Sequence, residues 1–194
     1  MSTPMNHRDH TTNKVTFGFW VYLMSDCVLF AGLFATYAVL QGQTFGGPGA
    51  SDIVDLPYVL WETLLLLASS FTMGLALLLS YKGKKAATLI ALVATLVLGL
   101  GFLGLEVNEF VKLAGEGAGP DKSAFLSSFF TLLGVHGAHV AAGAVWMLVL
   151  MAHVVARGLT AGTTRKLACL ALFWHFLDII WIFIFTFVYL FATI

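Results

Sequence analysis

Residues 86–105 read AATLIALVATLVLGLGFLGL, a run of twenty positions without a single charged side chain. A helix needs about 20 mostly apolar residues to cross the hydrocarbon core of a bilayer. The stretch therefore predicts a transmembrane helix. Together with four other long apolar runs it gives five expected helices, at about 17–40, 57–81, 86–110, 124–155 and 166–192. Gly, Pro and charged residues separate the runs, as is typical of loops.

The composition agrees with a membrane protein. Of the 194 residues, 59% are hydrophobic and 10% are charged, whereas a soluble domain carries roughly 25% charged residues. The net charge is zero, which leaves no basic excess for binding nucleic acid. The runs are continuously apolar rather than alternating, which excludes a transmembrane β-barrel. We expect an all-α polytopic fold, with an N-terminal tail over 1–16 and a five-helix transmembrane bundle over 17–194.

The cations predict how the chain crosses the membrane. Eight of the ten precede the first run or lie in the loops after the second and fourth runs, namely Arg8, Lys14, Lys82, Lys84, Lys85, Arg157, Arg165 and Lys166. Only Lys112 and Lys122 lie in another loop. By the positive-inside rule we expect a cytoplasmic N-terminus and a periplasmic C-terminus in a bacterial inner membrane. The first run reads as a retained anchor because no A-x-A-like cleavage site follows it.

Acids and histidines occur inside the expected spans, where no Lys or Arg does. They are Asp26, Glu62, Glu106, Glu109, His136, His139, His175 and Asp178. A charged side chain at the bilayer centre costs about 2.5–3.5 kcal/mol, so such residues are functional candidates. Judged by depth, we expect one network between the fourth and fifth helices at mid-membrane. A second network should join the second and third helices near the outer surface.

Three interpretations of these residues stay open. The first is a transition-metal site, for which the histidines and a carboxylate supply only a few ligands. The acids can also titrate during transport as a proton relay. The leading interpretation is that buried polar pairs fix helix packing and contacts with partner subunits. Because G-x-S-x-G, H-E-x-x-H, P-loop and C-x-x-C-H motifs are absent from the sequence, we assign no catalytic, cofactor-binding or metal residue.

Two further features predict packing. Gly134, Ala138 and Ala142 recur every four residues in the fourth run, with Gly137 and Ala141 beside them. Small residues at this spacing let another helix approach closely. Aromatic side chains form belts at membrane surfaces, and we place Tyr58, Trp61 and Tyr189 in the outer belt.

Several segments resemble subunit III of the haem-copper respiratory oxidases. These are WHFLDIIWIFIF at 174–185, HGAHVAAG at 136–143 and GLEVNEF at 104–110. Further segments are similar to the quinol-oxidase branch of that family, the bo-type ubiquinol oxidases: FGFWVYLMSDCVLFAGLFATYAVL at 17–40, GPDKSAFLSSFF at 119–130 and CLALFWHFLDIIW at 169–181. The resemblance runs from about residue 15 to the end. Five helices instead of seven also agree with this branch, which includes menaquinol-type enzymes.

The resemblance implies a role in a complex that oxidises ubiquinol, reduces oxygen to water and pumps protons. Haem b, haem o and copper would belong to subunit I, and subunits I, II and IV would be the partners. This chain would hold no redox centre, pack on subunit I, bind phospholipid, and support assembly and sustained turnover. The eight intramembrane residues match family positions and would have structural, lipid or proton-environment roles. The alternative is an independent proton-coupled transporter that uses Asp26, Glu62 and Asp178.

Overall fold

The chain folds into long helices joined by short loops. A computed structural model describes residues 7–193, with side chains described for residues 17–50 and 53–192. The helices are α1 (His7–Leu40), α2 (Ala50–Ile53), α3 (Leu56–Tyr81), α4 (Lys85–Gly115), α5 (Ala124–Arg157) and α6 (Ala161–Ile184). Five of the helices described are long and apolar enough to cross a membrane. The all-α architecture and the five spans are thereby confirmed, and α2 is an additional single turn.

The helix bounds differ from the expected ones mainly at the ends. Helix α1 begins at His7, so part of the segment expected as a tail is helical; residues 1–6 of that segment lie outside the described residues. Helix α6 begins at Ala161, where the Thr160 hydroxyl accepts a 3.2 Å hydrogen bond from the Thr163 N–H and caps the first turn. Beyond Ile184 the chain continues as a π-helix over Phe185–Leu190.

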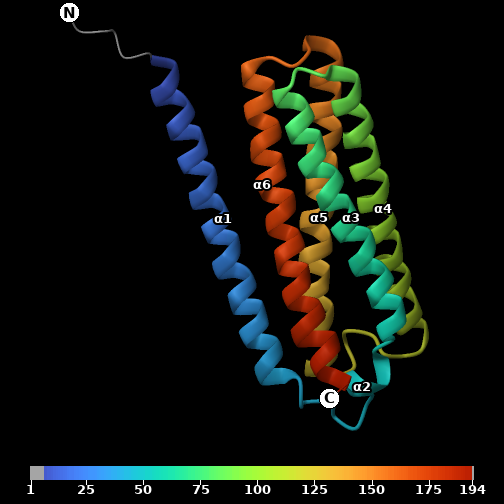
Figure 1. Cartoon of the computed structure of the whole chain (residues 1–194). Helices are drawn as coiled ribbons and strands as arrows, with labels where there is room; N and C mark the ends of the chain where they lie inside the picture. Colours follow the sequence, from blue (N-terminus) through green and yellow to red (C-terminus); the bar gives the residue numbers. More distant parts are fainter. Residues whose placement is uncertain (1–6, 194) are drawn as a thin grey trace, which may run out of the picture.

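Four helices form a bundle, and α1 leans against its side. Figure 1 shows α3, α4, α5 and α6 packed together, while α1 diverges from them toward the N-terminus. The α3–α4 and α5–α6 loops lie at the N-terminal end of the molecule, and α2 lies at the opposite end with the C-terminus (Figure 1). The loop cations other than Lys112 and Lys122 are therefore at one end. Arg8 and Lys14 lie outside the residues whose side chains are described, and the membrane orientation stays a prediction.

Trp174 of α6 holds the bundle together. It is 1% exposed, and its indole N–H donates a 3.0 Å hydrogen bond to Ser69 on α3. The same ring lies so close to Gly99 of α4 that a Cβ there would be 2.7 Å from it, and a Cβ at Gly143 of α5 would be 3.1 Å away. Close packing of this kind is what small residues permit in membrane helices. One side chain thus touches the other three helices of the bundle.

The glycines that make close contacts are only partly the expected ones. Ala138, Ala141 and Ala142 are exposed on the surface of the chain, so the close approach of another helix to them stays a prediction. A Cβ at Gly134 would make an ordinary 3.9 Å contact with Phe110, whereas Gly137 is tightly packed against α4. Within the chain, α5 makes its closest approaches through Gly137 and Gly143.

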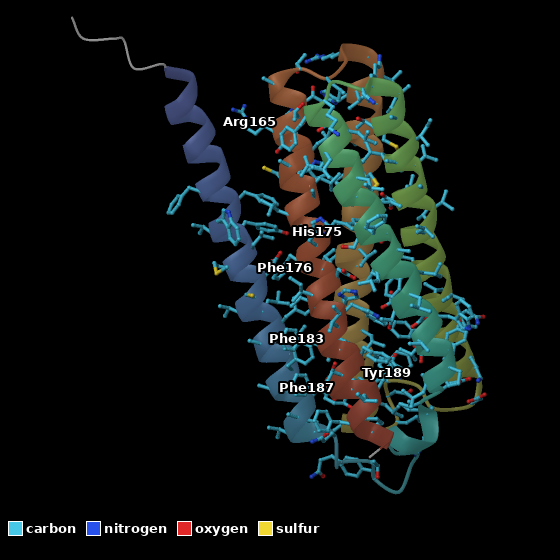
Figure 2. All side chains as sticks on the ribbon, in the orientation of Figure 1. Arg165, His175, Phe176, Phe183, Phe187 and Tyr189 are labelled. Atoms are coloured by element: carbon cyan, nitrogen blue, oxygen red, sulfur yellow. The ribbon has the colours of Figure 1, made fainter. Side chains whose placement is uncertain are left out.

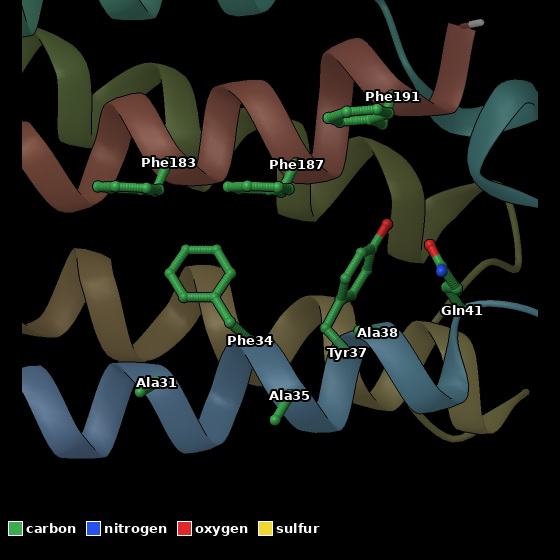
Figure 3. A pocket seen from close by; sticks show the side chains of 9 residues that line it. All are labelled: Ala31, Phe34, Ala35, Tyr37, Ala38, Gln41, Phe183, Phe187 and Phe191. Atoms are coloured by element: carbon green, nitrogen blue, oxygen red, sulfur yellow. The ribbon is translucent and has the colours of Figure 1, made fainter.

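An apolar groove separates α1 from the C-terminal half of α6. In Figure 2, Phe183 and Phe187 lie between these two helices, whereas Tyr189 lies on the bundle side. The groove has a volume of about 800 Å³ and is lined by Ala31, Phe34, Ala35, Tyr37, Ala38, Gln41, Phe183, Phe187 and Phe191. Three of the phenylalanine rings stack in a row, with centroids 6.0 and 5.7 Å apart, opposite Phe34 (Figure 3).

Candidate functional site

Three glutamates gather in the bundle toward the α2 end. Glu62 of α3 is fully buried, and Glu106 and Glu109 of α4 are 2% and 7% exposed. Glu62 lies close enough to both others for their charges to repel. The salt bridges Lys122–Asp121 and His139–Asp26 do not involve these acids, and of the three glutamates Glu109 is the one close enough to a cation, Lys112, to be attracted by it. The expected grouping of polar residues between the second and third spans is present.

Tyr189 belongs to this acidic cluster, so its assignment to the outer aromatic belt is wrong. It is fully buried, and its hydroxyl donates a 2.9 Å hydrogen bond to Oε2 of Glu109. Its position in the π-helix explains the error, because the wider turn changes which side chains face inward. Both Val188 and Tyr189 are buried there.

The side chain of Glu106 extends from α4 to α5. Its carboxyl group lies directly against Gly137, in the space that a Cβ atom would fill. The neighbouring His136 is fully buried, and its ring packs 5.3 Å from that of Trp181 and 5.9 Å from that of Phe102. Neither ring nitrogen of His136 has a hydrogen-bond partner within the described part of the chain. The cluster is thus closed off by aromatic rings on its inner side.

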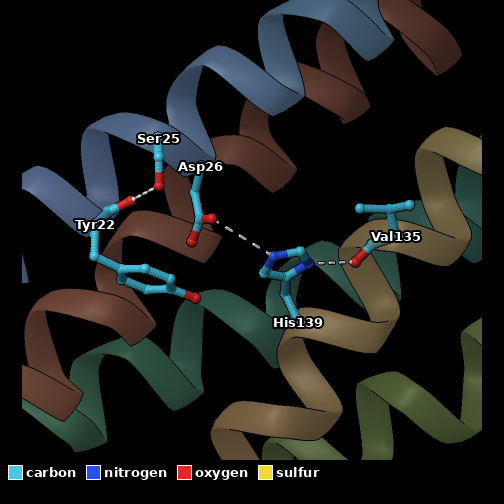
Figure 4. Close-up of polar contacts among 5 residues, drawn as sticks. All are labelled: Tyr22, Ser25, Asp26, Val135 and His139. Atoms are coloured by element: carbon cyan, nitrogen blue, oxygen red, sulfur yellow. Dashed lines mark hydrogen bonds and ion pairs between the residues drawn. The ribbon is translucent and has the colours of Figure 1, made fainter.

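A second polar pair joins α1 to α5. Nε2 of His139 lies 4.0 Å from Oδ1 of Asp26, and Nδ1 of His139 is 2.7 Å from the carbonyl of Val135 (Figure 4). Tyr22 lies beside Asp26 in the same view. The side chain of His139 is partly exposed, at 20%, whereas that of Asp26 is buried between the helices, at 9%. The pair helps to fix α1, which has few other polar contacts with the bundle.

A third polar group joins α6 to α3. The hydroxyl of Ser70 is 2.7 Å from Nδ1 of His175, and it also hydrogen-bonds Asp178. The expected mid-membrane network between the fourth and fifth spans is therefore not what forms: His175 and Asp178 contact α3, while His139 contacts α1. Estimates of depth along the membrane do not tell which helices are neighbours: His139 was grouped by depth with His175 and Asp178, but it pairs with Asp26.

Sequence reasoning missed the hydroxyl side chains that complete these contacts. Ser69, Ser70 and Tyr189 each accept or donate an interhelical hydrogen bond, and Trp181 donates a 3.0 Å bond to Thr63. The available signal was the presence of Ser and Thr within an apolar run, since these residues commonly bond across membrane helices. The spacing of these residues along the sequence does not indicate which residue on another helix each one bonds.

These groups can exchange protons and can form contacts between helices. Among the side chains of residues 17–50 and 53–192, no three His, Cys, Asp or Glu are grouped so that they would hold a metal ion. Carboxyl, imidazole and hydroxyl groups donate and accept hydrogen bonds, and the first two also bind and release protons. In a membrane interior such groups specify which helices meet.

Comparison with known proteins identifies the family. The sequence matches the family described as cytochrome c oxidase subunit III over residues 3–193, almost the whole chain. The chain belongs to this family. Subunit III membership agrees with the resemblance of the WHFLDIIW and HGAHVAAG segments, which contribute the polar residues described above.

Relatives within the subunit III family include quinol oxidase subunits. Cytochrome bo(3) ubiquinol oxidase subunit 3 of Pseudomonas aeruginosa is 57% identical over 97% of this chain and 90% of its own length. The Pseudomonas putida protein of the same description is 50% identical over 95% of this chain and 90% of its own. Quinol oxidase subunit 3 of Bacillus subtilis is 44% identical over 97% of this chain and 93% of its own. The similarity therefore covers all five spans.

Proposed function

We propose that this chain is subunit III of a haem-copper quinol oxidase, a complex that oxidises ubiquinol, reduces oxygen to water and translocates protons. The observation that carries the proposal is the 57% identity, over 97% of the chain, to a ubiquinol oxidase subunit 3. Ubiquinol is the proposed substrate because the relatives at 57% and 50% identity are both described as ubiquinol oxidase subunits.

The role of the chain in that complex would be non-catalytic. Haem b, haem o and copper would be bound by subunit I, and this chain would pack beside subunit I in an assembly that also contains subunits II and IV. Its own polar residues support this role, because Asp26, Ser70 and Tyr189 are engaged in contacts between helices of the same chain. The complex would lie in the bacterial inner membrane, with the cation-rich loops of this chain in the cytoplasm.

Phospholipid binding is the second part of the proposal. The groove between α1 and α6 is long, apolar and aromatic, and its volume of about 800 Å³ suits acyl chains. Toward the other end of α1, a second hollow is lined by aromatic residues with Arg165 and Lys166 beside them. Cations at that level are suited to a lipid phosphate. Ordered lipid on these surfaces would hold α1 in place and so support assembly and sustained turnover.

The decisive experiment is purification of the native assembly. An affinity tag on this chain, used after mild detergent extraction, should recover haem-containing subunit I and ubiquinol oxidase activity. A haem-free homo-oligomer without oxidase subunits would overturn the proposal. Proton-coupled transport by this chain alone in liposomes, lost in Asp178→Asn, would instead favour the transporter alternative.

A further inference from the structure

Five polar atoms lie buried without a hydrogen-bond partner in the half of the bundle nearer α2. Among the described side chains they are Oε1 and Oε2 of Glu62, Oε1 of Glu106, and both ring nitrogens of His136. Glu62 and His136 are fully buried, and Glu106 is 2% exposed. Burying a polar atom without a hydrogen-bond partner costs free energy. Several such atoms in one region therefore indicate that molecules able to form hydrogen bonds with them, such as water, bind there.

These atoms belong to one continuous region. Glu62 is within electrostatic range of Glu106 and Glu109, and the carboxyl group of Glu106 rests on the backbone of Gly137, the residue that follows His136. The rings of Phe30, Phe102 and Trp181 surround His136. Aromatic rings therefore close the region toward the middle of the membrane, and the carboxyl groups extend from it toward the α2 end.

Burial and mutual repulsion favour the protonated form of the carboxyl groups. An ionised carboxylate without a partner in an apolar interior costs many kcal/mol, so it takes up a proton instead. Glu109 has the Tyr189 hydroxyl as a donor, whereas Glu62 has no partner for either oxygen among the described residues. Three mutually close ionised groups would also repel one another. In their protonated forms, Glu62 and Glu106 would each have an O–H to donate.

A small cavity connects Glu109 with the α2 end. Its volume is about 150 Å³, and its lining includes Asp55, Tyr58, Asn108, Lys112 and Glu116 together with Glu109 itself. At about 30 Å³ for each molecule, a cavity of this size holds about five waters. Its polar lining supplies the two to four partners that each water needs. Glu109 thus stands between the cavity and the two more deeply buried glutamates.

We propose that Glu62, Glu106, Glu109 and His136 form a site that binds ordered water and exchangeable protons, and that the site communicates with the aqueous phase at the α2 end through this cavity. Water molecules would bridge the unpartnered oxygens and ring nitrogens, and Glu109 would pass protons between the cavity and the interior. The charged and titratable groups around the path are Tyr189, Asp55, Lys112 and Glu116. The site is independent of the proposed oxidase role.

Infrared spectroscopy of the purified complex tests the site directly. With glutamate labelled by ¹³C, the carbonyl stretch of protonated glutamic acids is separated from that of aspartic acids. We expect Glu62→Gln and Glu106→Gln each to remove one such band. The matched control is Asp121→Asn, which changes an acid whose side chain is 73% exposed in the loop after α4 and outside the cavity, and which should remove none.

Transfer into D₂O tests the access path, and the wild-type protein suffices for it. The two bands should shift as fast as the exposed loop amides exchange, and Asn108→Leu, which makes the cavity lining less polar, should slow that shift at least tenfold. Absence of protonated glutamate bands in the wild-type complex would overturn the proposal. Bands that do not shift for hours in D₂O would also overturn the proposal, because they would show that the acids are not accessible to water.

Discussion

The carboxyl group of Glu106 occupies the space beside the backbone of Gly137, so that α4 and α5 meet through an acid on one helix and a missing side chain on the other. Glu106 is 2% exposed. Both residues come from segments, GLEVNEF and HGAHVAAG, that also carry the family resemblance. The contact explains why a glycine follows His136.

Gly137→Ala should separate α4 from α5. A Cβ at this position overlaps the Glu106 carboxyl group, and overpacking of this kind costs about 1–3 kcal/mol. We expect less assembled complex and a lower melting temperature, measured by thermal loss of the haem spectrum. Gly134→Ala is the matched control on the same helix, because its Cβ would make an ordinary 3.9 Å contact. Equal behaviour of the two variants would contradict the contact.

Tyr189→Phe should destabilise the acidic cluster without changing its shape. The substitution removes the hydroxyl that donates a 2.9 Å hydrogen bond to Glu109 and leaves a buried acceptor unsatisfied, at a cost of about 1–3 kcal/mol. The free energy of unfolding in mild detergent, followed with increasing denaturant, measures the effect. Tyr81→Phe changes a tyrosine that is 64% exposed and should be neutral. A neutral Tyr189→Phe would mean that Glu109 is satisfied by other groups.

Asp178→Leu should impair assembly more than oxygen reduction. The change removes a hydrogen-bonding partner of Ser70, which links α3 to α6 through His175. We expect a reduced yield of complex but near-normal oxidase activity for each assembled haem. Asp178→Asn retains the size and hydrogen-bonding capacity of the side chain and should assemble better than Asp178→Leu. Fully assembled, haem-replete complex without activity would instead show a direct role in the reaction.

Phe187→Ala should weaken lipid binding in the groove between α1 and α6. It removes the middle ring of the row formed with Phe183 and Phe191 (Figure 3). We expect fewer phospholipids on the purified complex, counted by mass spectrometry, and a faster decline of activity during turnover. Phe71→Ala serves as the control, since Phe71 is 68% exposed on α3 and outside this groove. Unchanged lipid content would remove the groove as a lipid site.

The spans were predictable because the length and apolarity of a helix are local properties of the sequence. The interior acids and histidines were predictable for the same reason, since a titratable residue in an apolar run is visible without a structure. The residues that these acids and histidines contact were not predictable. His175 contacts Ser70 of α3 instead of a histidine of α5, because neighbours depend on how each helix is rotated and placed. Depth alone leaves those two quantities undetermined.

Tyr189 shows the second kind of error. An aromatic residue near the end of a span usually belongs to the interfacial belt, and the sequence contains no Pro or Gly at 185–190 to signal a change of winding. The π-helix nevertheless brings Tyr189 into the acidic cluster. Among the small residues of α5, Gly137 faces α4 while Ala138 is exposed, so a close approach of another helix to Ala138 stays a prediction.

The position of Trp174 has a consequence for evolution. Its ring fills the space in front of glycines on two different helices and bonds a serine on a third. A larger residue at position 99 or 143 is therefore tolerated only if the residue at 174 becomes smaller at the same time. Sequences that diverge at these positions should change them together, as a correlated set whose members are 31 to 75 residues apart along the chain.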